Sequence, residues 1–545
     1  MSLNFFIFLS FYFIILISIL GYGCLLLSFD KVNKNFFNLG YVGLIGLFLL
    51  VIYSYFSNLF IAHSKPHNLI LILFGFFSFL YFFKKNFRKP KFIKNFYLVL
   101  AVFLILFLSL LIEKNHDDFP YYHFPYTFQL TQDSLNFGIG KLNHGFRTPS
   151  SIFYLNSLFF LPIADYYLFN FSAAFILGFA NIILLNKILN FDNDKKTLDF
   201  RNYLSLLSFI FLNIFFYRLS EHGTDRSAQV LILILFIHLL GNFQIKKFNR
   251  NDQLVTYLIL GLIISLKSFY FLYLIFFIPF LIFILEKEKD MNTALKFIFL
   301  NKYFVFLLSS IFFVILINFT NTGCLIYPAS FTCFESFQWS LPVENVKKMN
   351  DWYELWSKAG ANPNFRVQNP EQYILGFNWV ENWIDKYFFN KVFDFILGLF
   401  AILLILFLSF IKNKQELKKI KIYKPTYVTY FFLLVIFFEW FFNHPSLRYG
   451  GYCVIVLLLF IPFSFYLDQM NVNYRVYLKI SLIFVSISLI TFEIRNSTRI
   501  LNEVNIYNYK PFKETFYSID KKYFEIQKII ENSKNNKGVF SKTIF

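Results

Sequence analysis

Long, almost uninterrupted apolar runs recur along the chain and are separated by shorter polar segments. A helix needs ~20 mostly apolar residues to cross about 30 Å of hydrocarbon, whereas the strands of a membrane barrel would alternate polar and apolar positions. The pattern predicts an all-α fold, a polytopic transmembrane helical bundle of about 14 spans with interfacial helices and extracytoplasmic loops. The predicted spans are residues 3–28, 36–61, 68–83, 95–112, 165–189, 203–217, 229–243, 254–266, 268–285, 303–319, 391–411, 426–442, 451–467 and 478–494.

Composition excludes the main soluble alternatives. Hydrophobic residues make up 57% of the 545 positions and charged residues only 15%, while Phe alone occupies 84 positions. A water-soluble surface needs far more charge, so a soluble enzyme, a disulfide scaffold and a disordered chain are excluded. The first run, residues 3–28, is longer than the apolar region of a signal peptide and lacks a small-residue cleavage site, so we interpret it as the first span.

The net charge of +19 is concentrated in a few short connections. Six Lys or Arg lie in residues 84–94, and six Lys with one Glu lie in residues 412–424. Such clusters are typical of cytoplasmic loops, so no nucleic-acid partner is expected. Counting spans outward from these loops places residues 113–164, residues 320–390 and the C-terminal tail outside. We expect a multi-pass protein of the cytoplasmic (inner) membrane whose functional face is the periplasm or exterior.

Three segments do not fit a simple span. Residues 254–285 are long for one crossing and contain Lys267. We predict two crossings there, because a single one would move the lysine cluster near 418 to the outside. Residues 150–162 are short, which favours an interfacial or re-entrant helix. An apolar stripe upstream predicts an amphipathic helix that lies in the membrane interface. That stripe consists of Phe124, Phe128 and Leu135.

An acidic pair, Asp117 and Asp118, directly follows the fourth predicted span. Two adjacent carboxylates at the membrane surface can accept a proton from a substrate hydroxyl, or hold a divalent cation such as Mg²⁺ or Mn²⁺. The alternative is a helix end that carries solvated charge. His123 and His144 lie downstream and can bind substrate or move protons near neutral pH. The histidine spacing matches no zinc motif.

A second polar turn lies between the predicted spans at 203–217 and 229–243, on the same side as the acidic pair. Glu221, Asp225 and Arg226 belong to it. Their side chains are candidate partners for a polar ligand, and Asp225 is a third candidate ligand for a divalent cation.

Three further cations, Arg147, Lys267 and Arg448, lie near predicted span ends, and Tyr449 follows the last of them. A fixed cation at the edge of an apolar slab is costly unless it is paired or binds an anion, and a lipid phosphate is a natural partner. The alternative is snorkelling to the headgroups. Basic residues are scarce on this side, which favours binding for Lys267 and Arg448.

The second outside segment, residues 320–390, combines two cysteines with many aromatic and amide side chains. We expect Cys324 and Cys333 to form a disulfide that stabilises the loop, because an outside compartment is oxidising. The Trp-rich and Asn-rich remainder suits an interfacial belt or stacking against sugar rings. Cys24 and Cys453 fall inside spans and are interpreted as small apolar residues.

Together these features resemble the GT-C superfamily of polytopic glycosyltransferases, which includes protein O-mannosyltransferases and lipid A aminoarabinose transferases. The resemblance rests on the acidic pair at 117–118, the adjacent interfacial helix, Asp225, a Gly-x-x-x-Tyr-Pro segment at 323–328 and the Arg-Tyr pair at 448–449. It implies three parts: extra N-terminal helices in residues 1–94, a catalytic transmembrane module in residues 95–494, and a short tail in residues 495–545.

The resemblance also implies a reaction. A polyprenyl-phosphate-linked sugar would be the donor, and a glycan, lipid or protein hydroxyl would be the acceptor, with membrane lipids around the site. Asp117 or Asp118 would deprotonate or orient the acceptor hydroxyl. The acceptor oxygen would then attack the anomeric carbon from the face opposite the leaving phosphate and invert its configuration. Arg448 and Lys267 would stabilise the leaving phosphate. His123, His144, Arg147, Glu221, Asp225, Arg226 and Tyr449 complete the predicted substrate-binding set.

Two other functions remain open from the sequence. A lipid-linked polysaccharide polymerase or ligase would also have many spans and outside arginines, but it would rely on basic residues alone. A transporter or flippase usually carries ionisable residues or helix breaks near the membrane midplane. The predicted span interiors hold few charges, with Glu439 and Lys267 as exceptions.

Overall fold

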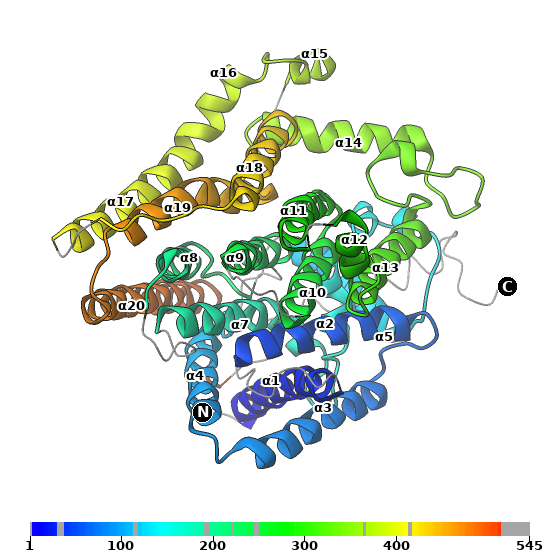
Figure 1. Cartoon of the computed structure of the whole chain (residues 1–545). Helices are drawn as coiled ribbons and strands as arrows, with labels where there is room; N and C mark the ends of the chain where they lie inside the picture. The colour runs from blue at the N-terminus through cyan, green and yellow to red at the C-terminus, as the bar shows by residue number, and fades with distance from the viewer. Residues whose placement is uncertain are drawn as a thin grey trace.

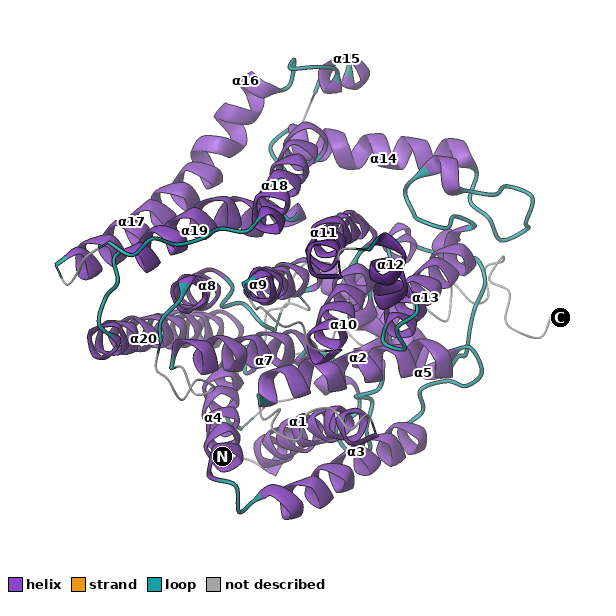
Figure 2. Cartoon of the chain, viewed as in Figure 1, coloured by secondary structure: helices purple, strands orange, loops and turns teal. Residues whose placement is uncertain are grey.

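The computed structural model describes residues 3–29, 38–112, 118–189, 197–220, 223–244, 250–288, 290–362, 367–412, 417–508 and 510–513. All secondary-structure elements within these ranges are helices (Figure 2). The described residues form two isolated β-bridges but no β-strand. The all-α prediction is therefore confirmed for the described residues.

Twelve described helical segments are long and apolar enough to cross a membrane. Two shorter apolar helices, α8 (Phe200–Phe215) and α10 (Arg250–Leu266), occupy the remaining predicted spans. Each predicted span thus coincides with a helix (Figure 1). The long segments are α1 (Leu3–Phe29), α2 (Leu39–Asn58), α3 (Lys65–Asn86), α4 (Pro90–Phe107), α7 (Phe171–Ile188), α9 (Thr224–Phe243), α11 (Phe277–Glu288) with the preceding η6 (Ser268–Phe276), α13 (Phe304–Thr322), α17 (Phe393–Ile411), α18 (Lys424–Asn443), α19 (Gly451–Gln469) and α20 (Tyr474–Tyr507).

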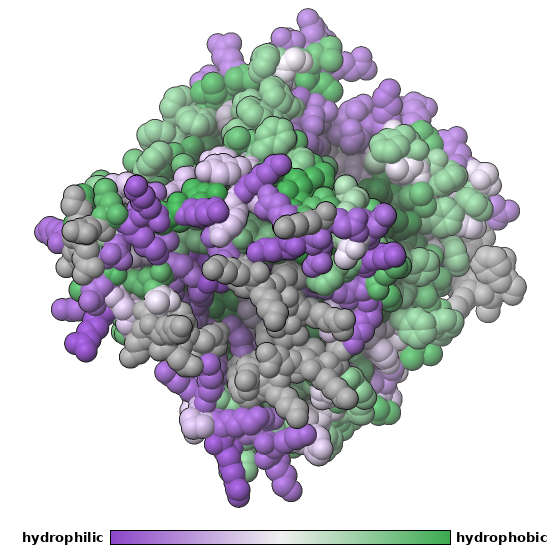
Figure 3. Space-filling model, viewed as in Figure 1, coloured by the Kyte–Doolittle hydropathy of each residue, from purple (hydrophilic) through white to green (hydrophobic). Residues whose placement is uncertain are grey.

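Burial divides the bundle into a centre and a lipid-facing rim. Nearly all residues of α7, α8 and α9 are buried, and α7 packs against α2, α4, α8 and α9. In contrast, α3, α17 and α18 expose large apolar side chains such as Phe77, Phe400 and Phe431. In Figure 3, hydrophobic residues gather over α17 at the upper left and on the right side of the molecule. Such a surface is stable against hydrocarbon and unstable against water, so the chain is a multi-pass membrane protein.

The chain breaks at Lys267, as the two-crossing prediction required. Helix α10 ends at Leu266, Lys267 is extended at φ −165° and ψ 145°, and η6 begins at the next residue. The break turns the Lys267 side chain out of the α10 helical surface, which places its ammonium group in the site described below.

The outside segment before α7 differs from the interfacial prediction. Helix α5 (Phe124–Gln132) forms, but Phe124 and Phe128 pack in a buried cluster with Phe169 instead of lying in the interface. Leu135 lies beyond the end of the helix. Helix α6 (Ser151–Ser157) is also fully buried, and its 7 residues span only about 10 Å, too short for a crossing. The stripe of α5 therefore packs against residues that lie far away in sequence, and α6 is too short to cross the membrane, as predicted for residues 150–162.

The other outside segment contains helices that the apolar pattern did not predict. An amphipathic helix, α14 (Val343–Lys358), is followed by α15 (Pro370–Ile374) and α16 (Val380–Trp383). A short helix, α12 (Met291–Phe299), lies between α11 and α13. In Figure 1 a long loop connects α13 to α14, and the far end of α14 lies beside the end of α18. This arrangement brings the aromatic side chains of α14 to the site.

Candidate functional site

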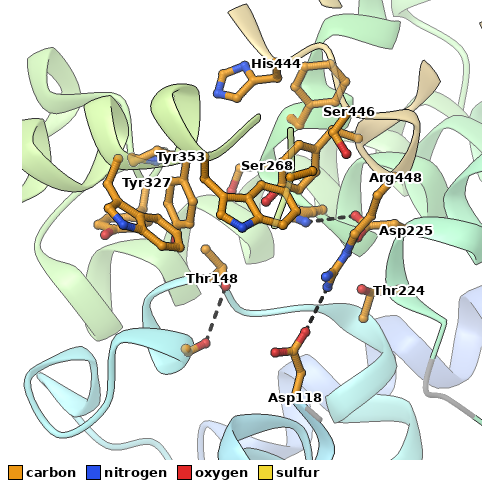
Figure 4. Close-up of a pocket in the computed structure, with 18 of the residues that line it drawn as sticks. Asp118, Thr148, Thr224, Asp225, Ser268, Tyr327, Tyr353, His444, Ser446 and Arg448 are labelled. Carbon is orange, nitrogen blue, oxygen red and sulfur yellow. Dashed lines mark hydrogen bonds and ion pairs between the residues drawn. The ribbon is translucent and has the colours of Figure 1, made fainter. Parts of the chain in front are cut away.

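Four charged side chains from distant parts of the sequence meet in one cavity of about 780 Å³ (Figure 4). They come from the N-terminal ends of η2 (Phe119–His123) and α9, from the α10–η6 break, and from η9 (Leu447–Tyr449) between α18 and α19. These residues are Asp118, Asp225, Lys267 and Arg448.

Arg448 joins the two carboxylates. Its Nη2 donates to Oδ2 of Asp118 at 3.0 Å, and its Nε donates to Oδ2 of Asp225 at 3.0 Å. Gln229 of α9 donates to the Arg448 carbonyl oxygen at 3.1 Å and accepts from the amide of Cys453 at 3.1 Å. The guanidinium is therefore held in place by both its backbone and its side chain.

Aromatic side chains hold the loop that carries Arg448. Trp383 Nε1 donates to the Pro445 carbonyl at 2.9 Å, and Trp440 Nε1 donates to the Ser446 carbonyl at 2.8 Å. The hydroxyl of Tyr387 accepts from the amide of Leu447 at 2.9 Å. These bonds satisfy loop backbone groups that the neighbouring helices leave unpaired, so the loop is fixed beside the cavity.

Asp225 lies in the first turn of α9, where the helix dipole favours negative charge. Its carboxylate is 5% exposed, and Lys267 Nζ donates to its Oδ1 at 2.8 Å while Arg448 binds its Oδ2. Lys267 also lies 4.6 Å from the ring centroid of Tyr449. Both oxygens of Asp225 are thus neutralised by cations, and this carboxylate positions Lys267 and Arg448.

Asp118 is the more accessible carboxylate. Its side chain keeps 27% of its surface exposed, compared with 6% for Asp225. It lies directly before η2, and Tyr122 of that element also lines the cavity. A carboxylate that is exposed to the cavity and held by a guanidinium can receive a hydrogen bond from a bound hydroxyl.

An aromatic wall faces these charges. Trp352, Tyr353 and Trp356 lie on α14, and Trp356 packs edge-on against Tyr449 with ring centroids 5.7 Å apart. Tyr327 of the loop after α13 extends the wall. Rings of this kind offer flat apolar faces with polar edges, a surface suited to a ligand that has both C–H and hydroxyl groups.

Burial and neighbouring charges shift the pKa values of the groups that line the cavity. Burial alone would lower the pKa of Arg448, but the negative charge of Asp225, supported by Tyr122, Tyr449 and Asp118, raises that pKa well above its usual value. Burial and the positive charge of Lys267 lower the pKa of His444 to about 4. The guanidinium is therefore charged and His444 is neutral near pH 7.

His144 is another neutral histidine of the cavity. Burial and the nearby Arg147 lower its pKa below the usual value, while Asp118 acts in the opposite direction. Its Nδ1 is hydrogen-bonded to the hydroxyl of Tyr121 at 2.6 Å. In this state it serves as a hydrogen-bonding group and adds no positive charge.

Most of the predicted site residues reach this cavity. Arg147 is not among the lining residues, and its Nε donates to the Gly140 carbonyl at 2.9 Å. Asp117 and Glu221 lie outside the described residues. The predicted residues that line the cavity are Asp118, His123, His144, Asp225, Arg226, Lys267, Arg448 and Tyr449.

Sequence reasoning missed several lining residues. Tyr122, Thr148, Lys391 and His444 had no pattern to distinguish them. The tryptophans of α14 were noted only as members of a Trp-rich segment. Because they come from an amphipathic helix that crosses over the cavity, their helical spacing was the signal that could have identified them.

The predicted disulfide is present between Cys324 and Cys333. It closes the loop that follows α13, and Ile326 and Ala329 within that loop line the cavity. Cys24 and Cys453 are buried inside the bundle, as expected for small apolar residues. The bridge therefore supports one wall of the cavity.

The donor set of the cavity fits a divalent cation poorly. Among the described residues, no group of three or more His, Cys, Asp or Glu side chains is arranged to hold a metal ion. Both oxygens of Asp225 already bind Lys267 and Arg448, which a cation would have to displace. A site that also uses Asp117 stays a prediction.

The bundle and its charged, aromatic cavity define a polytopic helical membrane protein with a polar cavity formed by segments that connect the helices. A family model described as a domain of unknown function (DUF8201) matches residues 5–455, so the chain belongs to that family. No curated protein and no solved structure matches the chain.

Proposed function

We propose that the protein is an integral-membrane glycosyltransferase. It moves a sugar from a polyprenyl-phosphate donor to an acceptor hydroxyl on the extracytoplasmic side, with inversion at the anomeric carbon. The observation that carries this proposal is the position of Asp118, an accessible carboxylate, beside two cations and opposite an aromatic wall in one cavity.

The charge of the cavity suits an anionic ligand. Its lining residues include four cations and two carboxylates. A cavity with excess positive charge attracts a phosphate, and guanidinium and ammonium groups are its usual partners. The lining cations are Arg226, Lys267, Lys391 and Arg448.

Two of these cations keep donors for a ligand. Within the described part of the chain, Nη1 of Arg448 makes no hydrogen bond, and Lys267 Nζ makes one, to Asp225. A phosphate in the cavity would accept from both. These are the groups that would stabilise the negative charge that develops on the leaving phosphate.

The proposed reaction balances as follows. The acceptor oxygen bonds to the anomeric carbon as its proton passes to Asp118. The bond from the anomeric carbon to the donor phosphate oxygen breaks, and its electron pair remains on the phosphate. A phosphate is a weak base, so no general acid is needed. The aromatic wall of α14 would stack on the sugar ring and orient its anomeric carbon.

The test is sugar transfer in proteoliposomes, with a panel of polyprenyl-phosphate sugars as donors. Asp118→Asn keeps the shape but loses the base, so we expect a rate loss on the order of 10²–10⁴-fold. The matched control is Asp165→Asn, because Asp165 lies in the same connection between α4 and α7 but pairs with Lys65 and does not line the cavity. An Asp117→Asn variant tests the neighbouring carboxylate in the same assay.

Two results would contradict the proposal. One is the absence of transfer from every donor in the panel by the folded wild-type protein. The other is an unchanged rate in Asp118→Asn. Transfer that survives combined Asp117→Ala and Asp118→Ala substitution would favour a polymerase or ligase that depends on basic residues alone.

A further inference from the structure

Arginine side chains gather around Tyr217, just beyond the end of α8. The guanidinium carbons of Arg218, Arg495 and Arg499 lie 5.8, 4.5 and 5.9 Å from the centre of the Tyr217 ring. Nε of Arg218 donates to the Tyr217 hydroxyl at 3.4 Å. A fourth arginine, Arg226, donates from Nη1 to the Arg218 carbonyl at 3.0 Å. We call these four arginines and the tyrosine the Tyr217 cluster.

The cluster lies at one end of the membrane-spanning helices. Arg218 and Arg226 flank the turn between α8 and α9, and Arg495 and Arg499 lie one turn apart on α20, which packs against α8 (Figure 1). Along the axis of α20, Arg495 lies about 30 Å from the start of the helix. This distance equals the thickness of the hydrocarbon core of a bilayer. The Tyr217 cluster is therefore at headgroup level, at the end opposite to the start of α20.

Three guanidinium groups surround the Tyr217 ring, so positive charge is concentrated at this position. Partial burial alone would raise the pKa of Tyr217, but the hydrogen bond from Arg218 and the charges of Arg218, Arg495 and Arg499 lower it below the usual value. The local field is thus strongly positive. Arg218 and Arg495 are exposed, so a ligand can reach them.

We propose that the Tyr217 cluster is a second anion site, which binds the phosphate of a lipid. Guanidinium groups bind phosphate through paired hydrogen bonds, and only a lipid presents a phosphate permanently at headgroup level. Arg226 belongs to this cluster and also lines the cavity described above. The site is therefore adjacent to the cavity, and its ligand is either a phospholipid of the bilayer or a lipid-linked substrate. The proposal does not depend on glycosyl transfer.

Native mass spectrometry of the delipidated full-length protein tests this site. The probes are phosphatidylglycerol, polyprenyl phosphate and diacylglycerol, and diacylglycerol lacks the phosphate. We expect the wild-type protein to retain both phosphate lipids and not diacylglycerol. Combined Arg495→Gln and Arg499→Gln substitution should weaken phosphate-lipid binding about tenfold or more, because two charged donors are lost.

The matched control is Arg475→Gln, at the opposite end of the same helix α20 and also exposed. It should bind both lipids like the wild type. Arg218→Gln, on a different element, should weaken phosphate-lipid binding several-fold. It provides an independent test of the site if the double variant is less stable than the wild type. Competition then distinguishes the sources: polyprenyl phosphate that resists excess phosphatidylglycerol identifies a substrate-binding site, and equal competition identifies a bilayer phospholipid site.

The proposal is overturned if diacylglycerol binds as tightly as the phosphate lipids, or if both arginine variants bind like Arg475→Gln. Lipid binding is measured without any transfer reaction, so failure of this site and failure of the glycosyltransferase proposal are distinguishable.

Discussion

Asp225 is the residue on which the charge balance of the cavity depends. Its buried carboxylate binds Lys267 and Arg448, so each cation lies close to a negative charge. Loss of one member of such a pair leaves the partner charge uncompensated, which costs more than the pair contributes. Asp225 therefore has a structural part in the site, whereas Asp118 is the more exposed of the two carboxylates.

We predict that Asp225→Asn lowers the stability of the protein by about 3 kcal/mol. Adding Lys267→Met should restore part of this loss, because it removes a cation that has lost its partner. Thermal unfolding in detergent, followed by tryptophan fluorescence, measures both variants. An Asp225→Asn protein as stable as the wild type would show that the ion pairs do not hold the cavity together.

His444 gives the cavity a predictable response to acid. Its pKa is about 4 in the folded protein, below the usual histidine value of about 6.5, so between these values the unfolded chain binds more protons than the folded chain. The stability that neutral His444 contributes is fully present above about pH 6.5 and is lost as the pH falls toward 4. His444→Gln should therefore show a smaller fall in melting temperature between pH 7 and 5 than the wild type. Equal falls in the two proteins would refute this assignment.

At the scale of elements, the disulfide loop and α14 form the wall of the cavity that faces the charges. The Cys324–Cys333 bridge has a sequence separation of 9 and follows α13 directly. Cross-linking a loop of this length restricts the unfolded chain and contributes about 2–3 kcal/mol. The loop residues Ile326 and Tyr327 should lose their fixed positions when the bridge is absent.

Combined Cys324→Ser and Cys333→Ser substitution should lower the melting temperature and the rate of sugar transfer. Reductant should bring the wild-type melting temperature down to that of the double variant and leave the variant itself unchanged. If reductant alters both proteins equally, its effect comes from elsewhere in the chain, and the bridge does not stabilise this wall.

Elements with a continuous apolar pattern were predictable from sequence, and elements defined by tertiary contacts were not. The break at Lys267 was visible because a cation interrupts an apolar run that is too long for one crossing. Helix α5 looked interfacial because its stripe of Phe124 and Phe128 has no partner nearby in sequence; its partners include Phe169, at the start of α7. Helix α14 was missed because its amphipathic pattern carries no long apolar run.

The same distinction holds for the site. Asp118 was identified as one of two adjacent carboxylates and Asp225 as part of a polar turn between spans. Lys267 and Arg448 were identified because a cation beside an apolar span is costly. Their mutual distances were not readable, because they depend on how α9, η6 and η9 pack. His444 and Thr148 are unremarkable in sequence and join the site only through that packing.

At the scale of the whole molecule, the central claim is that the cavity opens to the extracytoplasmic side and takes a lipid-phosphate sugar. The cysteine content of the chain allows a direct test. The protein has 4 cysteines, of which Cys324 and Cys333 are bridged and Cys24 and Cys453 are buried. A cysteine in place of Thr148, which lines the cavity, would therefore be the only readily reactive thiol.

The decisive measurement is labelling of Thr148→Cys by a membrane-impermeant maleimide in intact spheroplasts, with and without a polyprenyl-phosphate sugar. Lys84→Cys, in the exposed last turn of α3, is the matched control for the opposite side. We predict that Thr148→Cys is labelled without permeabilisation and is protected by the sugar donor, while Lys84→Cys is labelled only after permeabilisation. Labelling of both positions from the same side, or labelling of Thr148→Cys that the donor does not slow, would contradict the account.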